Sequence, residues 1–272
     1  MKKIVYALLL AVIMQGCAFG AAKNAAKVGF LSRLNVSEEE FAKIVQDSRN
    51  MRGWHVNSSR HNKFGVKFYD SLAIMQMAMN RREMHELALP EVVAEYLLAN
   101  NRDLEACCVA RTDVSIGLAL GFRKDDAALA ARFDEALQAM KDDWTLSKLH
   151  KEYINNKGKI SPVKFDTFKG AKTIRVAVTG DMPPIDYIDA AGNPSGFNAA
   201  FLAELGRHLH VNMKLVNTET GARTAALVSG RVDVVLWYET SQDRSWNVDA
   251  PDGVLLSKPY YSWDKFLHIK QK

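Results

Sequence analysis

The hydrophobic positions of this chain follow two periods that alternate along the sequence. Short apolar runs rich in β-branched and aromatic residues, such as "KVGFL" (27–31) and "TIRVAVTG" (173–180), predict strands. Longer stretches with an apolar residue every three or four positions, such as "AALAARFDEALQAMKDD" (127–143), predict amphipathic helices. Because strands and helices alternate, the sequence predicts an α/β fold with a mostly parallel sheet flanked by helices.

The same patterns place elements along most of the chain. In the first half they predict strands at 27–31, 63–71, 85–90 and 104–110, and helices at 37–51, 72–83 and 91–101. In the second half they predict strands at 114–123, 173–180, 211–217 and 231–239, and helices at 127–143, 197–210 and 221–230. The segment "KDDWTLSKLHKEYI" (141–154) has Trp144, Leu146, Leu149 and Tyr153 at helical spacing and is typical of the end of a protein. A fresh strand pattern nevertheless follows it.

The first residues are typical of an export signal. Lys2 and Lys3 precede an apolar run that is too short to span a bilayer, and "MQGC" follows with Gly16 before Cys17. We interpret residues 1–17 as a signal peptide with a lipobox, in which Cys17 is lipidated and becomes the first mature residue. Cleavage after Gly20 is the alternative. Either way we expect the protein in the periplasm or on the outer face of a bacterial membrane.

Composition narrows the possible partners. The chain has 272 residues, 48% hydrophobic and 25% charged, with a net charge of +5. This charge is weak and dispersed, which argues against nucleic acid as a partner. Cys107 and Cys108 lie in an apolar run that predicts a buried strand, and no histidine pair has ligand spacing on a helix. We therefore expect a monomer with no metal and no cofactor.

Several motifs together resemble one bacterial family. Residues 173–211, "TIRVAVTGDMPPIDYIDAAGNPSGFNAAFLAELGRHLHV", resemble the opening of the polar amino-acid type of periplasmic solute-binding proteins, family 3. "ALVSGRVDVVLWYETSQDRS" (226–245) is similar to the segment that follows there, and "LLSKPYY" (255–261) resembles the family's Phe-Ser-x-Pro-Tyr. Residues 115–154 look like its closing strand and helices. The resemblance implies two α/β lobes that close on a small ligand.

The order of these motifs differs from the family. The strand resembling 173–180 comes first in the family, and the helix resembling 141–154 comes last. The resemblance therefore implies a circularly permuted, type II-like periplasmic-binding-protein fold with hinge strands between the lobes. We assign the second lobe to 23–113, the first lobe to 114–262 joined through the linker 155–172, and a hinge strand to 263–272. We also expect "TIRVAV" and "KVGFL" to lie in separate sheets, with both termini at the hinge. Two fused partial domains are the alternative.

The resemblance also implies ligand-binding residues in the first lobe. Arg244, in "TSQDR", matches the family arginine that pairs with an amino acid's carboxylate, a task suited to a planar guanidinium. Thr240 and Ser241 precede it as hydroxyl donors. Trp237 and Tyr238 stand where the strand reaches the cleft. They either wall the pocket or pack in the core.

Other predicted site residues depart from the family's pattern. Asp181 and Met182 lie in the turn where the family usually presents an aromatic platform. Arg33 lies in the second lobe's first turn, as a cleft residue or a plain surface residue. Pro90 stands where the family places an Asp for the α-amino group, and proline cannot pair with an ammonium. A ligand without an α-amino group is therefore expected to bind about as well as one with it.

The sequence thus predicts a binding protein rather than an enzyme. We expect it to capture a small carboxylate-bearing ligand, an amino acid or related organic anion, for an ABC transporter by hinge closure. Its partners are then the ligand, the transporter permease and, through a lipid on Cys17, the membrane. An enzyme on the same scaffold, of a dehydratase-like kind, and a ligand-sensing signalling lipoprotein are the alternatives.

Overall fold

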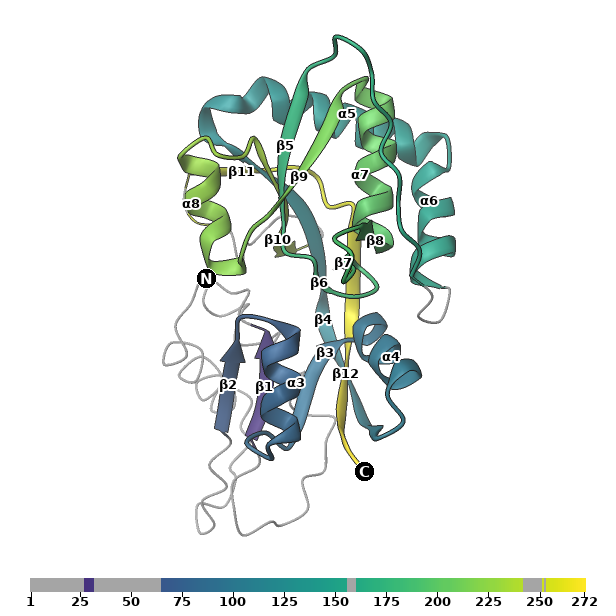
Figure 1. The fold of residues 1–272 in the computed structure, drawn as a ribbon, viewed down its shortest axis with the longest axis vertical. Helices are drawn as coiled ribbons and strands as arrows, with labels where there is room; N and C mark the ends of the chain where they lie inside the picture. The colour runs from purple at the N-terminus through teal and green to yellow at the C-terminus, as the bar shows by residue number, and fades with distance from the viewer. Residues whose placement is uncertain (1–26, 32–64, 156–159, 242–250, 252) are drawn as a thin grey trace. The chain divides into compact units, whose positions relative to one another are not determined.

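A computed structural model describes residues 27–31, 65–155, 160–241, 251 and 253–272 (Figure 1). The expected α/β fold is confirmed. The chain forms two compact units, unit 1 with Met1–Ile116, Ser241–Val248 and Trp263–Lys272, and unit 2 with Gly117–Thr240 and Asp249–Ser262. Three strands contribute residues to both units: β4 (Leu104–Arg123), β12 (Tyr261–Gln271) and, through Ser241 alone, β10 (Val234–Ser241).

The described part of unit 1 contains short parallel strands and two helices. Its elements are β1 (Lys27–Leu31), β2 (Gly65–Tyr69), α3 (Leu72–Asn80), β3 (Glu86–Pro90) and α4 (Glu91–Asn100), with parts of β4 and β12. β1 lies between β2 and β3 and is parallel to both, whereas β12 is antiparallel to β3. On α3, Met75 and Met79 are buried while Ile74 and Met77 are exposed, so the methionine-rich helix packs one face into the core.

Unit 2 holds most of the helices among the residues that the structure describes. Its elements are η1 (Lys124–Asp126), α5 (Ala127–Asp142), α6 (Thr145–Leu149), η2 (His150–Ile154), β5 (Thr173–Val178), β6 (Asp181–Met182), β7 (Asp186–Ile188), β8 (Pro194–Ser195), α7 (Gly196–Leu209), β9 (Asn212–Asn217), η3 (Thr220–Ala222), α8 (Arg223–Val228), β10 (Val234–Ser241) and β11 (Val254–Leu256). β5 is parallel to both β9 and β10. In Figure 1, β5 and β9 lie between α8 and α7, and α7 packs against α5 and α6.

The helix α7 is largely buried, and two of its own rings, Phe197 and Phe201, pack against Tyr260. The ring of Tyr260 stacks on Phe201 with centroids 4.2 Å apart, and Phe197 lies 6.2 Å from Tyr260. The Tyr260 hydroxyl donates to Asn198 Oδ1 at 3.1 Å. These contacts fix the start of α7, and with it the turn that precedes the helix.

The expectation of separate sheets for "TIRVAV" and "KVGFL" is wrong. The strands form one hydrogen-bonded path in the order β2-β1-β3-β12-β4-β10-β5-β9, which contains both β1 and β5. The reason is the length of β4 and β12, which are 20 and 11 residues long and pair with strands of both units. The circular permutation is therefore not confirmed.

Two local expectations also need correction. The predicted strands at 104–110 and 114–123 are one strand, β4. Its first part is not buried, since Cys107 is an exposed free thiol and Cys108 is half-buried. The predicted helix at 141–154 is interrupted at Trp144, which has a φ of 65° and is 70% exposed. Trp144 therefore marks the junction of α5 and α6 and is not part of an apolar stripe.

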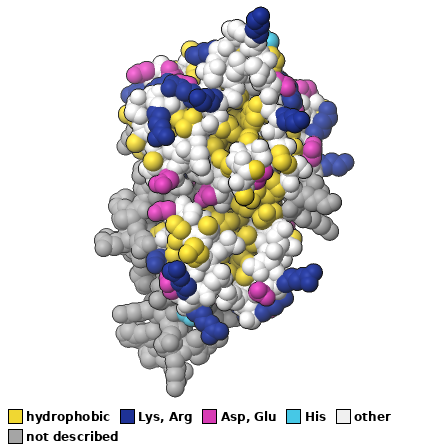
Figure 2. Space-filling model, viewed as in Figure 1, with side chains coloured by type: hydrophobic (Ala, Val, Ile, Leu, Met, Phe, Trp, Pro, Cys, Tyr) yellow, Lys and Arg dark blue, Asp and Glu magenta, His cyan; other side chains and the backbone are white. Residues whose placement is uncertain are grey.

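The surface shows no single concentration of charge on the face drawn in Figure 2. Lys and Arg side chains are spread over that face, with Asp and Glu among them. Within the described part of the chain, no helix has the length and apolar character needed to cross a membrane.

The contacts of Asp143, next to the junction at Trp144, predict that the stability of the fold depends on pH. Asp143 Oδ1 accepts from the backbone N–H of Thr145 at 2.9 Å, and its Oδ2 lies 3.1 Å from His208 Nε2. Hydrogen bonds from Thr145, and then from His208, lower the pKa of Asp143 from 3.8 to about 2. Burial lowers the pKa of His208, but Glu204 and Asp143 outweigh it and raise the pKa above 6.5.

We therefore expect Asp143→Asn to lower the thermal unfolding midpoint most between about pH 4 and pH 6.5, where the carboxylate is ionised and His208 is protonated. A lowered carboxyl pKa stabilises the fold above pH 3.8, and this contribution disappears as pH falls through about 2. The contribution of His208 disappears as pH rises through its raised pKa. Asp125→Asn, at an exposed position, serves as control. A midpoint difference that is independent of pH would contradict this account.

Candidate functional site

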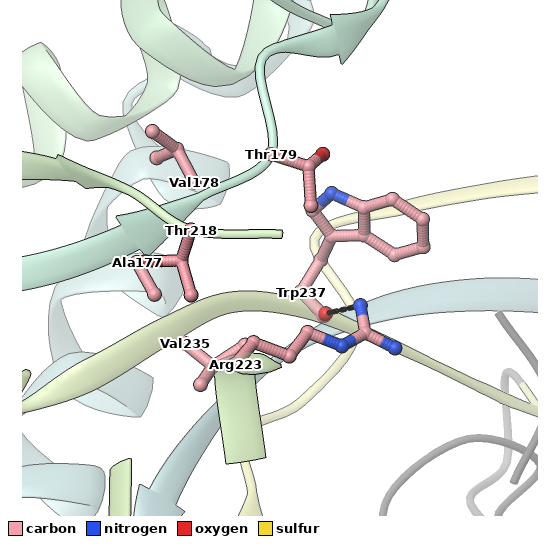
Figure 3. Close-up of a pocket in the computed structure, with 7 residues that line it drawn as sticks. All are labelled: Ala177, Val178, Thr179, Thr218, Arg223, Val235 and Trp237. Carbon is pink, nitrogen blue, oxygen red and sulfur yellow. Dashed lines mark hydrogen bonds between the residues drawn. The ribbon is translucent and has the colours of Figure 1, made fainter. Parts of the chain in front are cut away.

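The carboxyl ends of the parallel strands in unit 2 meet at one edge of the sheet. Val176 and Ala177 of β5 pair with Val234 and Val235 of β10, and β9 runs parallel on the other side of β5. Parallel α/β sheets bind ligands at this edge. A small pocket that is partly open to solvent lies here (Figure 3). Its lining residues come from these strands, the loops after them and α8: Ala177, Val178, Thr179, Thr218, Arg223, Val235 and Trp237.

A buried carboxylate, Asp186, holds this edge in place. Asp186 is 4% exposed, and its Oδ2 accepts from the Thr179 backbone N–H at 3.1 Å, the Thr179 hydroxyl at 2.7 Å and the Gly180 N–H at 3.1 Å. The indole Nε1 of Trp237 lies 3.4 Å from the same oxygen. One carboxylate oxygen thus joins the loop after β5 to a side chain of β10.

Arg223, the first residue of α8, brings a cation to the pocket. Its side chain is buried, with the residue 4% exposed, and Nη1 donates to the Trp237 carbonyl at 2.9 Å. Its guanidinium carbon lies 5.3 Å from the centroid of the Trp237 ring and 4.6 Å from that of Tyr238. The ring faces and the carbonyl favour the cation, so the guanidinium is fixed rather than mobile.

The structure brings some of the predicted site residues together and separates others. Trp237 lines the pocket. Tyr238 faces the other side of β10, packs in the core with Ala226 and Leu227, and places its hydroxyl 2.9 Å from Thr224 Oγ1. The two adjacent aromatic residues therefore lie in different surroundings, Trp237 at the pocket and Tyr238 in the core.

The remaining predicted residues lie at several places. Thr240 is buried near the end of β10, and Ser241 ends that strand. Asp181 and Met182 form β6 of the small sheet β6-β7-β8, where Met182 is buried. Pro90 is a buried residue of unit 1 between β3 and α4. The side chains of Ser241, Arg33, Arg244 and Cys17 lie outside the described residues.

Sequence reasoning missed Asp186, Arg223 and the two threonines. Arg223 is a lone charge in the apolar helix "GARTAALV", and a charge in such a context signals a buried cation. Asp186 lies near Asp181 in a polar turn, and nothing in the local sequence distinguishes the two. Among the residues that the structure describes, no group of three or more His, Cys, Asp or Glu side chains is arranged to hold a metal ion.

Comparison with known proteins relates one segment of the chain to a bacterial family. Residues 174–272 match the profile of the bacterial extracellular solute-binding proteins, family 3, which confirms the resemblance for this segment. No curated protein matches.

The similar solved structures have low identity. The ligand-binding component of an ABC-type import system from Staphylococcus aureus, with zinc bound, is 9% identical with a TM-score of 0.45, covering 92% of this chain and 66% of that one. The periplasmic aliphatic sulphonate binding protein from Escherichia coli is 11% identical with a TM-score of 0.41, covering 92% and 62%. The PBP AgaA from A. tumefaciens R10, in complex with agropinic acid, is 11% identical with a TM-score of 0.41, covering 77% and 55%. This chain thus spans less than two thirds of these proteins' lengths.

The hydrogen bonds of Asp186 generate a stability prediction. Asp186→Ala leaves the donors of Thr179, Gly180 and Trp237 without this acceptor in a buried place, so we expect the free energy of unfolding to fall by about 3 kcal/mol. Asp186→Asn keeps one acceptor oxygen and should cost less. Urea unfolding followed by tryptophan fluorescence measures both, with the exposed Asp125→Ala as control. Equal stability of Asp186→Ala and the control would show that the carboxylate does not hold this edge.

Proposed function

We propose that this chain, whose residues 174–272 match the bacterial extracellular solute-binding proteins of family 3, captures a small carboxylate-bearing solute outside the cytoplasm for an ABC-type import system. The observation that carries the proposal is the pocket at the carboxyl edge of unit 2, where the buried cation of Arg223 lies beside Trp237. All the lining residues of the pocket lie within residues 174–272, the segment that matches the family. A buried guanidinium suits an anionic group because its planar fork gives two parallel hydrogen bonds.

A binding role fits the chemistry of the pocket better than a catalytic one. Asp186, a carboxylate that contacts the lining residues Thr179 and Trp237, accepts three hydrogen bonds of 3.1 Å or less from the protein itself. Its role is to hold Thr179 and Trp237 in position.

We extend the proposal to the domain organisation. Residues 23–113 and 114–262 are the two lobes, they close on the solute by a hinge motion, and residues 263–272 are a hinge strand. Two features support this: the division of the chain into two compact units, and the presence of β4 and β12 in both. Permutation remains a proposal, supported by a family match that begins at residue 174, within the strand expected to open the family's first lobe.

Location and partners follow from the same proposal. A signal peptide over residues 1–17 exports the chain, and a lipid on Cys17 anchors it to the membrane. It then acts as a monomer that delivers its solute to a permease. Arg33, Thr240, Ser241 and Arg244 contribute to the solute site, with Arg244 as the anchor of the carboxylate.

The solute itself provides the test. We expect native mass spectrometry of the purified chain to detect a co-purifying small acid, and calorimetry to show that Arg244→Ala weakens its binding about 30-fold or more, because one side of a buried charged pair is lost. Arg244→Lys should recover part of the affinity, since a point charge lacks the fork geometry. Arg231→Gln, at an exposed position of unit 2, is the matched control. Unchanged affinity in Arg244→Ala removes this anchor, and the absence of any bound solute removes the proposed function.

A further inference from the structure

His150 is a titratable residue that packs among aromatic rings of unit 2. It begins η2, where the Asn155 N–H donates to the His150 carbonyl at 3.1 Å with the five-residue spacing of a π-turn. The imidazole meets the rings of Phe197 and Tyr261 nearly edge-on, with centroids 4.9 Å and 5.4 Å away. Its Nε2 is buried and has no hydrogen-bond partner in the structure. One nitrogen of this ring is therefore withheld from water without a protein group in its place.

This enclosure suits a neutral imidazole and not an imidazolium. A protonated ring carries a full charge and an N–H donor on both nitrogens, so the donor on Nε2 would be buried with no acceptor. Burial lowers the pKa of His150 below 6.5, and a hydrogen bond with the Tyr260 backbone opposes this in part. Packing and electrostatics thus both favour the uncharged form of His150.

The charges of the surrounding elements do not compensate for the burial of His150. The elements packed around it are α6, η2, α7 and the segment at Tyr260 and Tyr261. Burial, followed by Glu152 and Glu204, raises the pKa of Tyr153, but among the described residues no carboxylate or cation shifts the pKa of His150. The titratable and charged side chains on these elements are those of Lys148, Lys151, Glu152, Tyr153, Glu204, Arg207, His208, Tyr260 and Tyr261.

The start of α7, which contacts the imidazole through Phe197, also anchors the turn before this helix. The Phe197 N–H donates to the Pro184 carbonyl at 3.0 Å, and the Asn198 N–H donates to the Ile185 carbonyl at 2.7 Å. The next residue of the turn is Asp186, whose carboxylate holds the loop after β5. A loss of packing at Phe197 is therefore two hydrogen bonds away from the residue that positions this loop.

We propose that His150 is an acid-sensitive latch: its protonation releases η2 from Phe197 and Tyr261 and weakens the two hydrogen bonds between the start of α7 and residues 184–185. At neutral pH the uncharged imidazole packs among the rings and the latch is closed. In acid the charged imidazole leaves the rings for water, and η2 moves with it. The inference concerns control by pH and does not depend on which solute the chain binds.

Amide hydrogen exchange on the full chain tests the latch, with rates at pH 7.5 and pH 5 corrected for the intrinsic effect of pH on exchange. We expect protection at residues 150–154 and at the amides of Phe197 and Asn198 to fall by about fivefold or more at pH 5, since a buried donor without an acceptor is costly. His150→Phe keeps an aromatic ring that cannot be protonated, so its protection there should be equal at both pH values. His85→Phe, at an exposed position, is the matched control and should behave like the unaltered chain.

Thermal unfolding and a direct titration supply two further measurements. A lowered histidine pKa stabilises the fold above pH 6.5, and this contribution disappears as pH falls through the lower pKa of the folded state. The unfolding midpoint of His150→Phe, relative to that of the unaltered chain, should therefore rise as pH is lowered from 7.5 to 5. Titration of the imidazole followed by NMR gives the pKa of His150 itself, which keeps the inference testable if the variant does not fold.

Three results would overturn the latch: a pKa of His150 at or above 6.5, unchanged protection of 150–154 in the unaltered chain at pH 5, or an equal loss of protection in His150→Phe. A loss of protection confined to 150–154, with none at Phe197 and Asn198, would overturn the link to the turn before α7.

Discussion

The buried carboxylate of Asp186 is the interaction on which the carboxyl edge of unit 2 depends. A parallel sheet delivers strand ends to one edge, but the loops after them have no regular hydrogen bonds of their own. Asp186 supplies the missing acceptor, because its Oδ2 takes the backbone N–H groups of Thr179 and Gly180. It also orients Trp237 on the neighbouring strand. The pocket is shaped by this one group, although Asp186 is not among its lining residues.

The electrostatic character of the pocket follows from a second constraint, the burial of Arg223. A guanidinium withdrawn from water is costly unless nearby groups favour the cation. The Trp237 carbonyl and the faces of Trp237 and Tyr238 do so here, and they fix the guanidinium's position as well. In a region of low dielectric such a charge attracts an anion more strongly than it would at the surface. Under the proposed function, stability of the fold and affinity for an acid draw on the same contacts.

Periodicity predicted the α/β fold and most elements from residue 65 onward in the described parts, since the apolar stripe of α5 and the runs of β1 and β5 depend on local sequence. Periodicity gave the wrong result where tertiary contacts determine where an element begins or ends. β4 continues through the polar residues 111–113, which periodicity takes as a break, and Trp144 interrupts a helical pattern by adopting a left-handed conformation. The link between β1 and β5 in one strand path depends on pairings of β4 and β12 that no local pattern reveals.

The candidate site was predicted only in part for the same reason. Trp237 was identified because it stands at a strand end, where ligand sites of such sheets occur. Asp186 and Arg223 are distant in sequence, and both contact Trp237, Asp186 through the indole N–H and Arg223 through the backbone carbonyl. Pairings of this kind are set by the fold, so a single sequence offers little sign of them. Arg244 and Arg33 lie outside the described residues and remain predictions from the resemblance.

The central claim is that the solute binds at the carboxyl edge of unit 2, and hydrogen–deuterium exchange tests it most directly. Exchange is measured on the full chain with and without the co-purified solute at saturation. The account predicts slower exchange, by about tenfold or more, at backbone amides of 177–180, 218–223 and 235–238, with little change at the amino end of β9. Slower exchange confined to β1, β2 and β3 of unit 1, with none at these segments, would contradict it.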